Sequence, residues 1–134
     1  MSPEQVVREF CNAVSKRDPE ALRPLLAPSV VYQNVGVGTS DGIEATLENV
    51  AGQWAMFPEF YEFEIVNLAA SENVVLTERI DHVGLGGGAP IASVPVMGRF
   101  EVESGRITRW YDYFDTALVA KMFAGDDVHD LIPS

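Results

Sequence analysis

Three short stretches of the sequence put polar side chains where buried strands are expected. Residues two apart on a strand share a face, so Tyr32 lies beside Asn34. In the same way Arg79 lies beside Asp81 on a second strand, and a third strand carries Asp112. If these faces line one cavity, it holds two carboxylates, a guanidinium, a phenol and a carboxamide among apolar walls. Those groups suit an acid–base site that needs no metal.

The strand that carries Arg79 and Asp81 has two possible interpretations. Their face also carries Val75, Thr77 and Val83, while the opposite face mixes aliphatic residues with a glutamate and a histidine. Neither face is cleanly polar, so the alternation does not say which one is buried. A cross-strand ion pair on the surface is common and contributes little to stability. Taken alone, this strand favours the surface interpretation.

Asp112 lies in an aromatic row, because Trp110 and Phe114 share its face. Charged groups are seldom buried unless they are paired, so this position favours a functional site. Tyr111 and Tyr113 give the opposite face an apolar character of its own. A structural role for the aspartate therefore stays open.

Metal and phosphate sites are not indicated by the sequence. His82 and His129 lack partners at the spacing of metal ligands. The segment from Gly84 to Gly88 matches neither a dinucleotide-binding loop nor a P-loop. The Tyr32–Asn34 pair could simply satisfy buried hydrogen bonds. We expect no metal and no cofactor.

Composition limits the partners and the compartment. A length of 134 residues suits one domain, and a net charge of −11 disfavours binding to nucleic acid or to an anionic membrane. The single cysteine, Cys11, cannot form an internal disulfide and falls on the apolar side of the first helix. No signal segment or membrane-spanning run is seen. We expect a cytoplasmic protein.

The order of elements predicts an α+β fold. Helices come first, a run of hairpin-linked strands follows, and one more helix precedes an acidic tail at 126–134. The expected helices begin at Pro3, Pro19, Ile43 and after Asp115, and the last one ends at Phe123. The expected strands are 29–35, one around 61–65, 74–83, 91–102 and 106–114, with a loop at 36–42. We expect the helices to cover one face of a curved antiparallel sheet in a single domain, 1–134.

The motifs Tyr-x-Asn, Arg-x-Asp and Trp-x-Asp-Tyr-Phe-Asp, in this order, resemble those of the limonene-1,2-epoxide hydrolase family. The resemblance runs from the first helix to about Phe123. This family belongs to the NTF2-like, or cystatin-type, cone-fold superfamily, which also contains ketosteroid isomerases and SnoaL-type polyketide cyclases. It implies a mixed or antiparallel curved sheet, wrapped by N-terminal helices and followed by a short C-terminal helix.

The resemblance also implies a reaction and a role for each polar residue. Asp112 would be the general base, and Tyr32 and Asn34 would hold a water molecule against it. Asp81 would be protonated and would donate to the epoxide oxygen, while Arg79 would bridge the two carboxylates. Water would then open the ring in one step to give a vicinal diol. Two carboxylates that share a guanidinium titrate together, so one can keep its proton.

Apolar residues are expected to form the walls of the pocket. Four share the inward parity, and two on the third helix could cover the entrance; they are Val94, Val96, Trp110, Phe114, Trp54 and Phe57. Such walls favour cyclic, terpene-like or steroid-like epoxides. The outer face of the sheet is more apolar than exposure would favour. Since cone-fold relatives pair through this surface, we expect a homodimer there, with Ile107, Tyr111, Tyr113 and Met97 in the contact.

Other functions of the same fold remain open. A ketosteroid-isomerase-like site needs a neutral aspartate, and Arg79 beside Asp81 argues against one. An epoxide-opening cyclase would use a substrate hydroxyl in place of water. A non-catalytic module for small ligands would retain the pocket without the chemistry.

Overall fold

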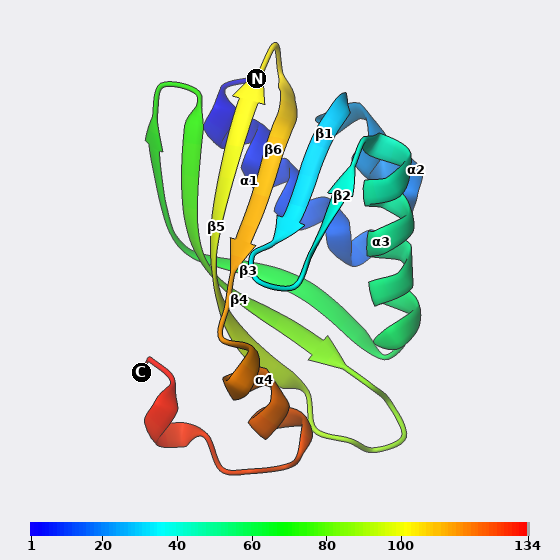
Figure 1. Ribbon diagram of the computed structural model, residues 1–134, viewed down its shortest axis with the longest axis vertical. Coiled ribbons are helices and arrows are strands. Elements are labelled where there is room, and N and C mark those ends of the chain that lie inside the picture. The colour runs from blue at the N-terminus through cyan, green and yellow to red at the C-terminus, as the bar shows by residue number, and fades with distance from the viewer. Residues whose placement is uncertain (134) are drawn as a thin grey trace.

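The computed structural model describes residues 1–133 and has the predicted α+β architecture (Figure 1). Its helices are α1 (Pro3–Ala13), α2 (Pro19–Leu22), α3 (Ile43–Met56) and α4 (Thr116–Phe123), with short 3₁₀ segments at Val14–Lys16, Arg23–Leu25 and His129–Leu131. Its strands are β1 (Leu26–Asn34), β2 (Gly38–Asp41), β3 (Phe60–Ser71), β4 (Val74–Gly84), β5 (Ala92–Glu103) and β6 (Arg106–Tyr113). None of the helices in the described part of the chain is both long and apolar enough to cross a membrane.

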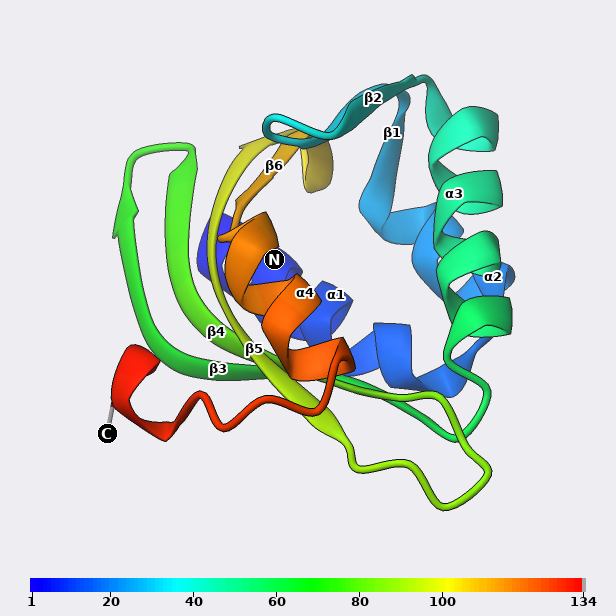
Figure 2. The same ribbon diagram turned by 60° about the horizontal axis from the view of Figure 1, so that its bottom comes forward.

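The strands form one curved, mixed sheet in the order β2-β1-β6-β5-β4-β3. β1 and β6 run parallel, and the other neighbouring pairs are antiparallel. Figure 2 shows β3, β4 and β5 curving on one side of the molecule, with α3 on the opposite side and α4 between them in this view. The concave face of the sheet therefore looks into the space between the strands and the helices.

Helix α1 fills part of this concave side. Ser2 and Gln5 close the predicted capping box, which satisfies amides that the first turn leaves unpaired. The apolar stripe of the helix then buries Val6, Val7 and Phe10 completely. The Phe10 ring meets the edge of the Trp110 ring at 4.8 Å between centroids. Contacts of this kind join α1 to β6 and fix the floor of the hollow.

The segment predicted as a loop at 36–42 contains strand β2, which pairs antiparallel with β1 from Asn34↔Gly38 to Val31↔Asp41. The prediction failed because β2 is a polar edge strand with no buried residue, so it shows no hydrophobic alternation. β3 also extends beyond the predicted 61–65, to Ser71, through a register shift between Ile65 and Asn67.

The register brings the three motif strands together. Asn34 on β1 lies directly beside Asp112 on β6, and Asp112 pairs with Gly98 on β5. Gly98 in turn pairs with Thr77 on β4, two residues before Arg79. Residues that are far apart in the sequence therefore meet on neighbouring strands of the concave face.

Candidate active site

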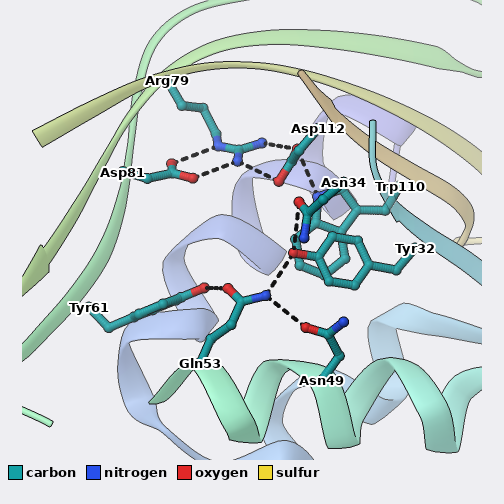
Figure 3. Close-up of polar contacts among 9 residues, drawn as sticks. All are labelled: Tyr32, Asn34, Asn49, Gln53, Tyr61, Arg79, Asp81, Trp110 and Asp112. Atoms are coloured by element: carbon teal, nitrogen blue, oxygen red, sulfur yellow. Dashed lines mark hydrogen bonds and ion pairs between the residues drawn. The ribbon is translucent and has the colours of Figure 1, made fainter. Parts of the chain in front are cut away.

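Arg79 lies at the centre of the site, between two carboxylates (Figure 3). Its side chain is fully buried. Nε donates to Asp81 Oδ1 at 3.0 Å and Nη2 donates to Asp81 Oδ2 at 2.8 Å. On the other side, Nη1 donates to Asp112 Oδ1 at 3.0 Å and Nη2 to Asp112 Oδ2 at 2.9 Å. The guanidinium thus makes two bidentate pairs, an arrangement that lysine could not replace.

The surface interpretation of this strand is wrong, because the whole face of β4 that carries Arg79 is buried. Val75, Thr77, Asp81 and Val83 lie on it, and all are at most 9% exposed. The Phe63 ring lies 4.5 Å from the guanidinium carbon, so the cation also rests on an aromatic face. The buried face is decided by what packs on it, which the sequence of the strand alone does not contain.

Gly98 provides the space that the guanidinium occupies. A Cβ atom at this position would lie 2.7 Å from Thr77 Oγ1 and 3.1 Å from Asp112 Oδ1, and closer still to Arg79 Nη1. A glycine within a strand often marks a close approach of this kind. Gly98 was not predicted as a site residue, although a glycine in the middle of an expected strand was visible in the sequence.

The two oxygens of Asp112 have different surroundings. Oδ1 accepts from Arg79 Nη1 and also from Trp110 Nε1 at 3.0 Å. Oδ2 accepts from Arg79 Nη2 alone among the described residues, and Asp112 lines the pocket. Oδ2 therefore retains lone-pair capacity for one more donor.

Asp81 differs from an ordinary aspartate in its protonation. Burial raises the pKa of its carboxyl to about 6, and the opposing effect of the Arg79 charge does not cancel the rise. The carboxyl group can therefore carry a proton in slightly acidic solution. It also lines the pocket, where a ligand can reach it.

A chain of hydrogen bonds between neutral side chains links β1, α3 and β3 (Figure 3). The Tyr32 hydroxyl donates to Asn34 Oδ1 at 3.2 Å and accepts from Gln53 Nε2 at 3.0 Å. Gln53 Oε1 accepts from the Tyr61 hydroxyl, and Gln53 Nε2 also donates to Asn49 Oδ1. Burial raises the pKa of Tyr32, so its phenol stays protonated. Gln53 and Tyr61 were not predicted from the sequence, because single polar residues beside apolar ones gave no distinct pattern.

These side chains surround a pocket of about 300 Å³. Four of the five polar motif residues line it: Tyr32, Asn34, Asp81 and Asp112. The fifth, Arg79, is fully buried and does not line it. Four predicted wall residues line it: Val94, Val96, Phe57 and Phe114. Further apolar lining residues were not predicted: Met56, Phe63, Val83, Val119 and Phe123. The cavity is therefore mainly apolar with one strongly polar side.

The two tryptophans predicted as wall residues do not line the pocket. Trp110 is fully buried, and its ring stacks on Tyr32 at 3.7 Å between centroids and 13° between planes. Trp54 belongs to the buried stripe of α3 with Leu47 and Val50. Gln53, one position earlier on the helix, faces the pocket instead, because successive helical residues point about 100° apart. Trp110 supports the site from below rather than forming its surface.

The outer face of the sheet carries two strongly exposed apolar residues among those predicted, Met97 (52%) and Tyr113 (48%). Ile107 is fully buried, so the prediction that it lies on this face is wrong. The β5–β6 register shifts between Val102↔Ile107 and Glu101↔Arg109. This bulge adds one residue to β6, so the alternation of side chains between the two faces of the sheet shifts by one position there. Ile107 therefore points to the buried face instead of the outer face.

No cluster of three His, Cys, Asp or Glu side chains within residues 1–133 is placed to hold a metal ion. The chemistry that the pocket can support follows from its own side chains. It has a carboxylate with spare accepting capacity, a second carboxyl with a raised pKa, and a fixed cation between them. With these groups the pocket can accept a proton at one position and donate a proton at another while it holds a single ligand.

Known proteins similar to this chain include epoxide hydrolases. The family of the limonene-1,2-epoxide hydrolase catalytic domain matches residues 1–124. Epoxide hydrolase EphG of Mycobacterium tuberculosis is 36% identical over 123 residues, which are 89% of this chain and 75% of that protein.

Solved structures show the same relationship and the wider fold. An M. tuberculosis LEH-like epoxide hydrolase superposes with a TM-score of 0.79 at 32% identity, covering 97% of this chain and 95% of the other. A hypothetical protein with a ketosteroid isomerase-like fold from Catenulispora acidiphila has a TM-score of 0.81 at 24% identity, covering 99% of this chain and 100% of the other. The second likeness concerns the fold alone.

Proposed function

Since this chain belongs to the limonene-1,2-epoxide hydrolase family and is an epoxide hydrolase, we propose that it adds water to an apolar cyclic epoxide in one step. The observation that carries the proposal is the buried Arg79 bridge between two carboxylates that both face one pocket. The product is a vicinal diol, and no covalent enzyme intermediate forms.

Asp112 is the general base in this mechanism. Its Oδ2 atom has room to accept a proton from a water molecule. Asn34 uses its carbonyl oxygen to accept from Tyr32, which directs the amide nitrogen of Asn34 to donate to that water. The water is thereby oriented with one proton toward Asp112 and a lone pair toward the epoxide carbon.

Asp81 is the general acid. The alkoxide that leaves as an epoxide opens is a poor leaving group unless it receives a proton. Burial keeps the pKa of Asp81 at about 6, so the group can donate at a pH where an exposed aspartate is ionised. As the water oxygen bonds to carbon, the carbon–oxygen bond of the ring breaks and the departing oxygen takes the Asp81 proton.

Arg79 links the two halves of the reaction. One turnover takes a proton from water onto Asp112 and gives a proton from Asp81 to the product. The guanidinium contacts both carboxylates through Nη2, so it compensates the negative charge whichever carboxylate holds the proton. A return of the proton from Asp112 to Asp81, through solvent, restores the starting state.

The apolar walls support a hydrocarbon-rich substrate. Val94, Val96 and Phe114 line the pocket together with the polar residues, and the rings of Phe57 and Phe123 stack with 5.8 Å between centroids on the helical side. A volume of about 300 Å³ suits a monocyclic, terpene-sized epoxide. The exposed Met97 and Tyr113 support our proposal of a homodimer formed through the outer sheet face. The buried single Cys11 supports a reducing, cytoplasmic compartment.

The test is turnover of a panel containing cyclohexene oxide, styrene oxide, limonene 1,2-oxide and one hydroxylated cyclohexene oxide, with products identified by mass spectrometry. We expect diols that have gained the mass of one water. An isomer of unchanged mass from a hydroxylated epoxide would indicate a cyclase, and absence of turnover across the panel would contradict the proposal.

A further inference from the structure

The pocket has a second polar patch, separate from the two carboxylates. It consists of Gln53 on α3 and Tyr61 on β3, and both residues line the cavity. Tyr61 is 5% exposed, so its hydroxyl is not a surface group. The reaction proposed above uses neither residue.

All hydrogen-bond donors of this patch are occupied, whereas some of its acceptor lone pairs are free of partners within residues 1–133. Both amide protons of Gln53 are donated, one to Tyr32 and one to Asn49. The Tyr61 proton is donated to Gln53. What remains is accepting capacity on Gln53 Oε1 and on the phenolic oxygen of Tyr61. The patch can accept from a ligand but has no proton left to donate.

Apart from its hydrogen-bond partners Tyr32 and Asn49, the patch has apolar neighbours along α3 and β3. Met56 and Phe57 follow Gln53 on the same side of α3, and Phe63 follows Tyr61 on the same face of β3. A substrate made only of hydrocarbon would leave the phenolic oxygen of Tyr61 and the second lone pair of Gln53 Oε1 without a donor, which disfavours its binding. A substrate with a hydrogen-bond donor at this point would satisfy them.

We infer that the Gln53–Tyr61 patch is a specificity subsite for a hydroxyl group, so that the preferred substrate is a cyclic epoxide bearing a hydroxyl remote from the ring oxygen. This inference rests on the proposed epoxide hydrolysis. The patch holds no formal charge, which favours a neutral donor over an ammonium group. The donor requirement excludes a carbonyl or ether oxygen as the recognised group.

The experiment uses three cyclohexene oxides that differ only in the substituent at ring carbon 4: isopropyl, 1-hydroxyethyl or acetyl. These groups have nearly the same shape. The isopropyl group has no polar atom, the 1-hydroxyethyl group offers a hydrogen-bond donor, and the acetyl group offers an acceptor only. For the unmodified protein we expect kcat/KM to be about five- to tenfold higher for the hydroxyethyl compound than for the other two, the effect of one hydrogen bond.

Two variants separate recognition from positioning. Tyr61→Phe removes one acceptor without touching Tyr32, and Gln53→Met removes the other. We expect both to reduce the ratio of hydroxyethyl to isopropyl kcat/KM toward one. Loss of Tyr32 positioning alone would lower both rates equally and leave the ratio unchanged. Tyr113→Phe, which removes the same atom from the outer face, should keep the ratio of the unmodified protein.

Each outcome bears on one proposal. Failure to convert any of the three compounds to a diol contradicts the hydrolase mechanism itself. Conversion of the isopropyl compound without preference for the hydroxyethyl compound overturns the subsite alone. So does a preference for the acetyl compound, or a hydroxyethyl preference that survives in both variants.

Discussion

The two sides of the pocket are built on different physical principles. The sheet side holds a cation and two carboxylates, fixed by four charge-assisted hydrogen bonds from one guanidinium. The helical side holds neutral groups from α3 and α4, and α4 has no buried residue. The first arrangement tolerates almost no change, because a buried charge that loses its partner is costly. We expect the apolar side chains of the second to tolerate substitution with much less effect on the chemistry.

The largest expected effect is on the sheet side. Asp112→Asn removes the proton acceptor while retaining the shape of the side chain. General-base catalysis contributes about 10²- to 10⁴-fold, and we expect kcat/KM for a hydrocarbon epoxide to fall within or beyond that range. Circular dichroism would check that the fold persists. Asp41→Asn, at an exposed position on β2, is the matched control and should retain activity.

A glycine-to-alanine substitution can be made on each side of the pocket, as Gly98→Ala on the sheet side and as Gly52→Ala on the helical side. On β5 the added methyl group would collide with Arg79 and Thr77, so we expect destabilisation by about 1–3 kcal/mol and a loss of activity of about a hundredfold, comparable with a misplacement of about 1 Å. Gly52→Ala on α3 meets no atom within 4 Å. Because alanine favours a helix, this control should gain about 0.5–1 kcal/mol in free energy of unfolding. Equal effects of the two changes in thermal melts would contradict the comparison.

The pH dependence of activity reports on the acid of the sheet side. Asp81 must be protonated to donate, and its pKa is raised to about 6 by burial. Activity therefore falls as pH rises through about 6, by about tenfold per unit beyond it when the proton is required. The same shift makes the folded state relatively more stable below the ordinary aspartate pKa, and this contribution is lost as pH rises through about 6. A kcat/KM that is constant from pH 5 to 8 would contradict the assignment.

The smallest expected effect is at the mouth of the pocket. Phe123→Ala removes the ring that stacks on Phe57 and exposes apolar substrate to water. We expect KM for an apolar epoxide to rise about three- to tenfold with little change in kcat, because the contact is present in both ground and transition states. A fall in kcat matching that of Asp112→Asn would show that the helical side takes part in the chemistry.

The sequence was informative where chemistry and spacing coincide. Tyr32, Asn34 and Asp112 were found because they occur two residues apart from partners on recognisable strands, and the same spacing placed Arg79 beside Asp81. Whether that pair faces inward could not be decided, since burial of the β4 face depends on α1 and Phe63, which pack against it.

Two predicted positions differ from the structure because the expected pattern was displaced by a single residue. Trp54 was chosen as a wall residue where its neighbour Gln53 lines the pocket, because a helical pattern does not fix which edge of the apolar stripe meets a cavity. Ile107 was placed outside because a bulge in β6 cannot be read from alternation. β2 was missed because a polar edge strand lacks any apolar period.

A single-turnover reaction in oxygen-18 water, with enzyme in excess over a cyclic epoxide, tests the proposed one-step attack most directly. If Asp112 acts as a base on water, the diol formed in the first turnover contains oxygen-18. If a carboxylate attacks the epoxide instead, the first diol contains only ordinary oxygen, and the label appears in an aspartate side chain; that result would contradict the account.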